Sequence, residues 1–114
     1  MIIGREFSFD AAHKLDWYNG KCKNLHGHTY KLIVLVKGDL NENGIIIDFK
    51  ELDDIVKKEV MDILDHSYLN EVIKNPTAEN ICVWIWDKLK NKIIGLYEIK
   101  LWETADSFAV YNGD

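Results

Sequence analysis

The chain has 114 residues, of which 47% are hydrophobic and 29% charged, and it carries a net charge of −5. This length suits a single domain over residues 1–114, and an acidic balance without a basic stripe excludes a general nucleic-acid-binding protein. No run of about 18 apolar residues could span a membrane, and the amino terminus lacks the pattern of a secretory signal, so we expect a cytoplasmic protein with reduced thiols.

Two strands are predicted in the first third of the chain. Residues 2–12 alternate with period two, which places their aromatic side chains on one face, and His13 continues the same parity. A polar loop over roughly 14–25 follows, and residues 26–37 are rich in the β-branched and aromatic residues that favour a strand. The middle of this second strand is apolar on both faces, so both must be covered. We expect another subunit to provide the second cover.

Two helices are predicted in the middle of the chain. Asp48 begins the first, and Glu51 completes a D-x-x-E capping box. Apolar residues recur there at three- and four-residue spacing, as an amphipathic helix requires. The stripe expected to be buried is Phe49, Leu52, Val56, Val60 and Ile63. Thr77, which follows a proline, is the predicted cap of the second helix.

Two further strands, over residues 94–103 and 107–112, complete the element order ββααββ. Short tight connections between neighbouring strands favour antiparallel pairing. The predicted class is therefore α+β, with an antiparallel four-stranded sheet and two helices on one face.

Three histidines are placed to share a metal ion. His26 and His28 point to the same face of their strand, about 6.6 Å apart, which lets both imidazoles reach one ion. His13 ends the preceding strand and meets them if the two strands pair. Three neutral imidazoles with an open fourth position indicate a catalytic zinc site, in which the metal polarises a substrate oxygen. The alternative is a set of strand-end histidines hydrogen-bonded to the backbone.

Cys22 lies four residues before His26, and its position leaves two roles open. As a fourth ligand it would close the site and make the zinc structural. As a thiolate beside the cation it would act as a base or nucleophile. Its place on a loop, outside the strands that present the histidines, favours catalysis. Cys82 lies in the apolar stripe of the second helix and is expected in the core.

Acidic residues and a fourth histidine offer further candidates. Asp65 precedes His66 at the end of the first helix and could orient its imidazole as a proton relay, although a histidine there can also interact with the helix dipole. Glu103 continues an apolar strand face, either as an exposed strand end or as an anchor for a ligand with two parallel N–H donors. Glu79 is expected to be a capping or solvated group.

Taken together, six blocks of the chain resemble the family of 6-pyruvoyltetrahydropterin and 6-carboxytetrahydropterin synthases. The resemblance extends over essentially the whole chain, and its blocks are FSFDAAH (7–13), CKNLHGH (22–28), IIIDFKEL (45–52), LDHSYLN (64–70), NPTAEN (75–80) and LWET (101–104). The resemblance implies the tunnelling fold, in which trimers close their sheets into a barrel and two trimers stack. It also implies a homo-oligomer whose active sites lie between subunits.

The resemblance implies roles for nine residues. Three would bind Zn²⁺: His13, His26 and His28. Three would form the catalytic group, a thiolate with a proton relay: Cys22, Asp65 and His66. Three would serve the substrate, the first by gripping the amino and ring N–H groups of the pterin: Glu103, Thr77 and Glu79.

The implied substrate is 7,8-dihydroneopterin triphosphate, and two branches of the family differ in the product. Three residues separate the thiol from the H-G-H motif, which looks like the branch that makes 6-carboxytetrahydropterin and acetaldehyde, towards queuosine and other 7-deazaguanine bases. Loss of triphosphate without C–C cleavage, as in the pyruvoyl branch, is the alternative, and a non-catalytic zinc- or pterin-binding oligomer is another. Four basic residues are candidates for the triphosphate by position alone: Arg5, Lys14, Lys21 and Lys23.

Overall fold

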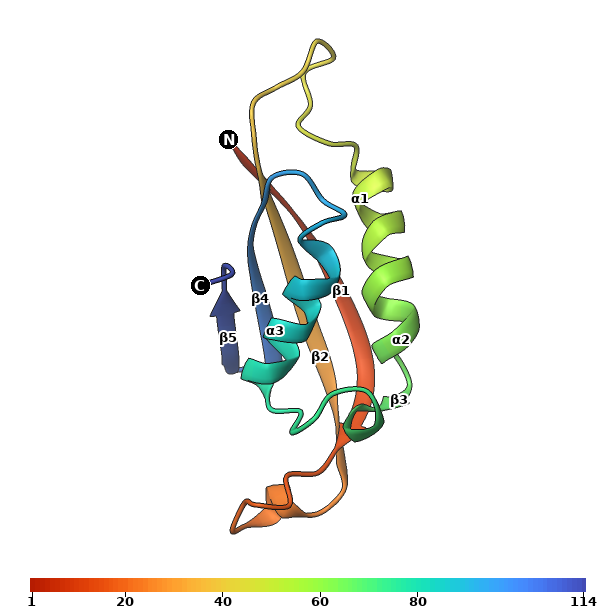
Figure 1. The fold of residues 1–114 in the computed structure, drawn as a ribbon, viewed down its shortest axis with the longest axis vertical. Helices are drawn as coiled ribbons and strands as arrows, with labels where there is room; N and C mark the ends of the chain where they lie inside the picture. The colour runs from red at the N-terminus through yellow and green to blue at the C-terminus, as the bar shows by residue number, and fades with distance from the viewer.

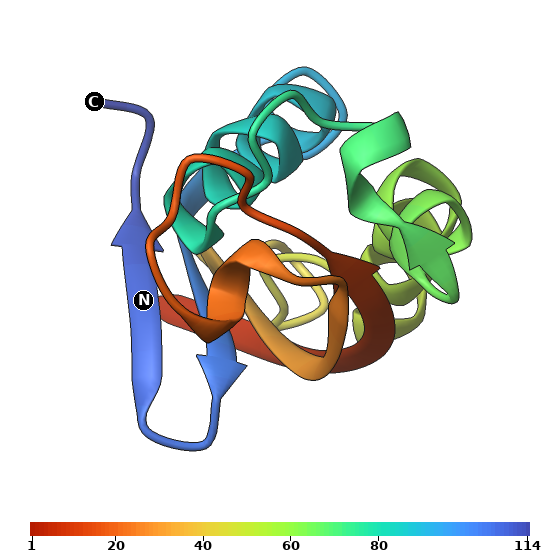
Figure 2. The same ribbon diagram turned by 90° about the horizontal axis from the view of Figure 1, so that it is seen from below.

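A computed structural model describes all residues, 1–114, and shows a curved sheet with two helical rods on one face (Figures 1 and 2). The sheet order is β3-β1-β2-β4-β5. The strands are β1 (Ile2–His13), β2 (His26–Lys37), β3 (Ser67–Tyr68), β4 (Leu96–Thr104) and β5 (Ser107–Tyr111). The helices are η1 (Lys21–Lys23), α1 (Phe49–Val56), η2 (Lys57–Met61), α2 (Asp62–Leu64), η3 (Leu69–Glu71) and α3 (Ala78–Leu89).

The predicted α+β class and the four long strands are confirmed, and the structure adds a fifth strand. β3 pairs in parallel with β1 through Ala11 and Ala12, so the sheet is mixed rather than wholly antiparallel. A two-residue strand shows no period in the sequence, and its partner lies more than fifty positions away. The sequence pattern therefore carries no signal for it.

β1 and β2 form one continuous antiparallel ladder, which runs from the pair Ile2–Lys37 to the pair His13–His26. From Phe7 to His13 in β1 and from Tyr30 to Val36 in β2, the residues that face the helices are buried, as the period-two pattern predicts. They pack with the inner sides of α1 and α3 into one hydrophobic core that includes Phe9, Tyr30 and Ile85. None of the helices is both long and apolar enough to cross a membrane.

The buried face of the first helical rod departs from the predicted stripe after its midpoint. Leu52, Val56 and Val60 are fully buried as expected, but Ile63 is 39% exposed and Leu64 takes its place in the core. The cause is η2, a stretch of π-helix that holds one more residue per turn than an α-helix. One extra residue moves the buried position from 63 to 64. Phe49, at the first helical position, is also half exposed.

The opposite face of the sheet has no covering element within the chain. Ile33 and Leu35 lie there, half-buried, as expected for the second apolar face of β2. On the same face Trp102 stacks on Phe108 with ring centroids 4.9 Å apart, and the Lys31 ammonium lies 5.2 Å from the Trp102 ring. This uncovered face agrees with the need for a second cover that the sequence predicts.

Candidate active site

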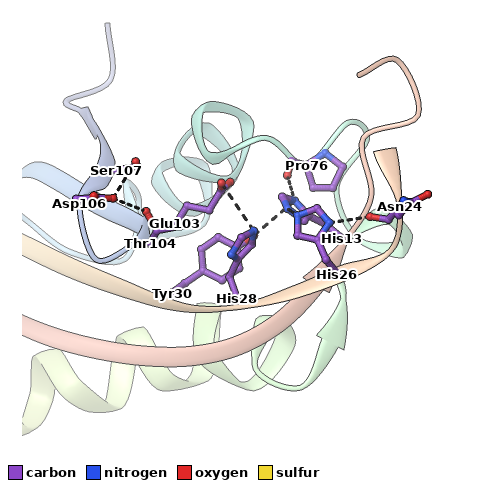
Figure 3. Close-up of polar contacts among 10 residues, drawn as sticks. All are labelled: His13, Asn24, His26, His28, Tyr30, Pro76, Glu103, Thr104, Asp106 and Ser107. Atoms are coloured by element: carbon purple, nitrogen blue, oxygen red, sulfur yellow. Dashed lines mark hydrogen bonds and ion pairs between the residues drawn. The ribbon is translucent and has the colours of Figure 1, made fainter. Parts of the chain in front are cut away.

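The β1–β2 ladder brings three histidines together at its loop end. His13 lies opposite His26, and His28 lies opposite Ala11, so all three side chains emerge on the helix side of the sheet. One ring nitrogen of each lies within 4.8 Å of the others, and the Nε2 atoms of His13 and His26 are 3.0 Å apart. Figure 3 shows the three rings converging. The structure thus gathers the residues predicted as metal ligands.

Backbone carbonyls determine which nitrogens of His13 and His26 face the centre. His13 Nδ1 lies 2.8 Å from the Pro76 oxygen, and His26 Nδ1 lies 2.7 Å from the Asn24 oxygen. A carbonyl oxygen only accepts hydrogen bonds, so each Nδ1 is the donor. In neutral imidazoles the two Nε2 atoms then direct lone pairs at each other across 3.0 Å. This arrangement suits a cation between them.

His28 supplies the third nitrogen of the cluster. Its Nε2 atom is buried without a hydrogen-bond partner, and the closest charged group, Glu103 Oε1, is 3.8 Å away. Burial lowers the pKa of His28, the nearby His13 and His26 act in the same direction, and Glu103 opposes them. The lowered pKa favours the neutral imidazole, which is the form that binds metal. Three such nitrogens fit Zn²⁺.

Glu103 and Tyr30 lie beside the histidine cluster, next to His28 (Figure 3). The Glu103 carboxylate is one-quarter exposed and turns towards His28. The Tyr30 hydroxyl is buried 3.5 Å from His13 Nδ1, and burial, with Glu103, raises the pKa of Tyr30. Tyr30 was not predicted as a site residue, although it shares the strand parity of His26 and His28.

The three residues predicted to serve the substrate lie around one end of α3. Glu79 and Glu103 line the same hollow, of about 330 Å³, with Phe108 on its wall. Thr77 does not line it, because its side-chain oxygen accepts a hydrogen bond from the Asn80 N–H and caps α3, as predicted. Glu79 is exposed in the first turn of that helix, where a carboxylate also favours the helix dipole.

Cys22 lies on η1, in the connection between β1 and β2. It is half-buried, and its carbonyl oxygen accepts a hydrogen bond from the Leu15 N–H at 3.0 Å. Its thiol is not part of the group of ligand atoms formed by the three histidines. Cys82 is buried in α3 as expected, and burial raises its thiol pKa to about 12.

Asp65 and His66 form a separate polar cluster with Asp10 of β1. Asp65 Oδ1 accepts a hydrogen bond from the Asp10 N–H at 3.0 Å and lies 3.1 Å from His66 Nδ1. The Asp10 N–H, first, and His66 hold the pKa of Asp65 below its usual value. His66 adopts a left-handed backbone conformation, with φ +60°, and its side chain is 80% exposed. Asp10 was not predicted for this cluster, since strand parity puts it on the face opposite His13.

The predicted metal ligands, the predicted thiolate and the predicted proton relay therefore lie in three separate places within one protomer. The histidines lie on the helix side of the sheet, Cys22 lies on the loop beyond them, and Asp65 and His66 lie at the outer edge of β1. Neither Cys22 nor His66 belongs to the histidine cluster within this chain.

Known proteins are similar to this chain in both fold and sequence. A curved sheet backed by two helices, with imidazoles gathered at one end, places the chain in the tunnelling-fold class. The model of the family described as 6-pyruvoyl tetrahydropterin synthase matches residues 2–114. The chain belongs to this family of pterin enzymes.

Individual relatives carry the names of both branches. The chain is 41% identical to 6-carboxy-5,6,7,8-tetrahydropterin synthase of Haemophilus influenzae, over 96% of each chain. It is also 41% identical to 6-pyruvoyl tetrahydrobiopterin synthase of Dictyostelium discoideum, over 100% of this chain and 97% of the relative. The structure of Caenorhabditis elegans 6-pyruvoyl tetrahydropterin synthase superposes with a TM-score of 0.90 at 27% identity, over 100% of this chain and 96% of that one.

Proposed function

We propose that this protein is a zinc-dependent 6-carboxy-5,6,7,8-tetrahydropterin synthase, a carbon–carbon lyase. It converts 7,8-dihydroneopterin triphosphate and water to 6-carboxytetrahydropterin, acetaldehyde and triphosphate. The observation that carries the proposal is the cluster of His13, His26 and His28, in which two Nε2 lone pairs face each other and the third nitrogen has no partner. Bound zinc would supply a Lewis acid for a substrate oxygen.

The other residues take roles that their chemistry supports. Glu103, beside His28, accepts the paired N–H groups of the pterin and fixes the ring relative to the histidines. Glu79 borders the same hollow, and Thr77 caps the helix that forms its wall. The Cys22 thiolate takes a proton from the substrate side chain. His66, oriented by Asp65, returns a proton elsewhere on the substrate.

The separation of the three clusters supports an active site shared between subunits. If Cys22, His66 and the histidine cluster act on one substrate, groups from a neighbouring copy of the chain would complete the site, because neither Cys22 nor His66 joins the histidine cluster within one protomer. The uncovered sheet face with Ile33, Leu35 and Phe108 supplies apolar surface for that contact. A trimer or a dimer of trimers would satisfy both requirements.

The choice between the carboxy and pyruvoyl branches depends on the loop before β2. Identity does not separate the branches, since relatives named for each are equally similar to this chain. The three-residue gap between Cys22 and His26 is the feature that favours the carboxy product.

Incubation of zinc-loaded protein with 7,8-dihydroneopterin triphosphate, followed by mass analysis of the products, tests the proposal. Acetaldehyde together with a carboxypterin is the expected result. A pyruvoyl product without acetaldehyde would assign the chain to the other branch. Absence of turnover by protein that contains a full complement of zinc would leave a metal- or pterin-binding oligomer.

A further inference from the structure

The loop that carries Cys22, residues 14–25, is attached to a distant segment of the chain, residues 70–76. We call residues 14–25 the Cys22 loop. Its first attachment is the side-chain amide of Asn70, which accepts a hydrogen bond from the Lys14 N–H at 3.0 Å and donates one to the Lys14 oxygen at 2.9 Å. This double hydrogen bond fixes the backbone immediately after the predicted ligand His13.

The second attachment is made by an exposed aromatic residue. Trp17 is 62% exposed, yet its indole Nε1–H donates to the Asn75 side-chain oxygen at 2.6 Å. Trp17 also packs edge-on against Tyr18. The indole N–H is thus the only group of this ring that forms a hydrogen bond, and it joins the middle of the Cys22 loop to the chain before α3.

Asn75 is a rigid partner for this bond. It adopts a left-handed backbone conformation, with φ +52°, and its carbonyl oxygen accepts hydrogen bonds from the Thr77 N–H and the Asn80 side chain, both at 2.8 Å. The next residue, Pro76, holds His13 through its own carbonyl oxygen at 2.8 Å. Two consecutive residues therefore hold a predicted metal ligand and the Cys22 loop at once.

Within the loop, the attachment is passed on to the thiol-bearing residue. Leu15 is buried, its N–H donates to the Cys22 oxygen at 3.0 Å, and its own oxygen accepts from the Tyr18 N–H at 3.0 Å. The backbone of Cys22 is thus tied to Leu15, which lies between the two attachment points at Lys14 and Trp17.

We propose that Trp17 is a positioning residue, which locks the Cys22 loop to Asn75 and so sets the position of the Cys22 thiol relative to the histidine cluster. The catalytic meaning of this lock rests on the proposed function, but the lock itself does not. Loss of the indole N–H removes one of the two attachments and makes the thiol more accessible, while the hydrogen bonds of Asn70 with Lys14 and of Pro76 with His13 remain.

Alkylation of Cys22 by iodoacetamide in the native protein tests the lock directly. Trp17→Phe keeps an aromatic ring and removes the N–H, and we expect alkylation of Cys22 to be about threefold to tenfold faster, as expected for loss of one hydrogen bond. Asn75→Gly removes the acceptor while glycine tolerates the positive φ, so it should reproduce this effect. The double variant should be no faster than either single one. Trp84→Phe, the same change at a half-buried position of α3, is the matched control, for which we expect the wild-type rate.

Cys82 provides an internal control, since it is buried in the core and is alkylated only if the fold opens. Faster labelling of Cys22 with Cys82 still protected supports the lock. An unchanged Cys22 rate in Trp17→Phe, or labelling of both thiols together, overturns it.

In the turnover assay the lock predicts that Trp17→Phe has a lower kcat with little change in KM. A raised KM with an unchanged alkylation rate would instead make Trp17 a direct substrate contact. Absence of turnover by the wild type would contradict the proposed function but leave the alkylation result to decide on the lock.

Discussion

The positions of the protons on the imidazole rings determine whether the histidine cluster can bind a cation. The carbonyl oxygens of Pro76 and Asn24 hold the protons of His13 and His26 at Nδ1, so both Nε2 atoms are directed inwards as acceptors. In the absence of a cation these lone pairs repel each other, and the buried Nε2 of His28 has no partner. The cluster therefore costs stability, and a bound cation would relieve this cost.

Zinc should accordingly stabilise the folded protein. Addition of zinc to chelator-treated protein should raise the melting temperature, by the equivalent of about 2.7 kcal/mol when zinc is at 100 times its Kd. His28→Ala should lose most of this response.

Cys22→Ala should keep the stabilisation by zinc, with a kcat at least about 100-fold lower because the proposed proton-transfer group is gone. A loss of bound zinc in Cys22→Ala would show that the thiol is a ligand rather than a base.

Asp65 gives a second prediction for a single residue. Its pKa is lowered from 3.8 in the folded state, mainly by the Asp10 N–H, so its charge stabilises the protein above this pH, and the contribution disappears as the pH falls through the folded-state value. The free energy of unfolding should therefore differ most between wild type and Asp65→Asn near neutral pH, and the difference should vanish in acid. Asp62→Asn, an exposed carboxylate on α2 without an ion pair, controls for net charge. A difference that is constant with pH would contradict this account.

At the level of elements, the π-helical stretch η2 changes which side chains of the first rod reach the core. It rotates everything after it by one residue, so Leu64 is buried and Asp65 leaves the helix next to β1. Without this insertion, the carboxylate would not meet the Asp10 N–H in the same register.

The shift caused by the π-helical stretch predicts that two adjacent truncations, at Leu64 and at Ile63, lower the free energy of unfolding by different amounts. Leu64→Ala removes a fully buried side chain and should lower the free energy of unfolding by about 2–5 kcal/mol. Ile63→Ala, at a position that is 39% exposed, should cost less than about 1 kcal/mol. Urea unfolding of the two variants measures the difference. Equal costs, or a larger cost at Ile63, would mean that the uninterrupted α-helical stripe is correct.

The sequence predicted the parts of the structure that depend on local period. The parity of β1 and β2 was sufficient to bring His13, His26 and His28 to one face, because antiparallel pairing of adjacent strands then determines the rest. The π-helical insertion was not predictable, because nothing in its composition distinguishes it from an α-helix. Nor were the contacts of Asp65 with Asp10 and of Trp17 with Asn75, which join residues more than fifty positions apart.

At the scale of the whole molecule, one face of the sheet has no covering element within the chain. The histidine cluster, Cys22 and the Asp65–His66 pair are also separate from one another in a single chain. The molecule is elongated, 53 × 24 × 24 Å, with the Cys22 loop at one end (Figure 1). The outer edge of β1 is paired only at Ala11 and Ala12 and is otherwise open for another strand. These features together favour an assembly in which each copy completes a neighbour.

An assembly of this kind should allow two inactive variants to restore each other. His28→Ala removes a proposed metal ligand, and His66→Ala removes the proposed relay, so each variant alone should be inactive. If the relay serves the histidine cluster of another subunit, unfolding and refolding them together in equal amounts should give some sites with both groups intact, about a quarter of the total for random assembly. The same variants refolded separately and then combined are the control. Activity that stays at the background level would indicate that each chain builds its own complete site.

The ladder between β1 and β2 has a further consequence for how this enzyme can diverge. The ladder ends at the His13–His26 pair, and the Cys22 loop begins immediately beyond it. A slip of one residue within the ladder would turn the histidines to the other face, whereas an insertion or deletion in the loop leaves their pairing intact. The ladder that presents the three histidines and the Cys22 loop are thus adjacent segments under different sequence constraints, since the register of the ladder sets the face of the histidines whereas the length of the loop does not. A relative with a longer or shorter loop can therefore keep all three histidines on one face, and the proposed choice of reaction can change with the loop alone.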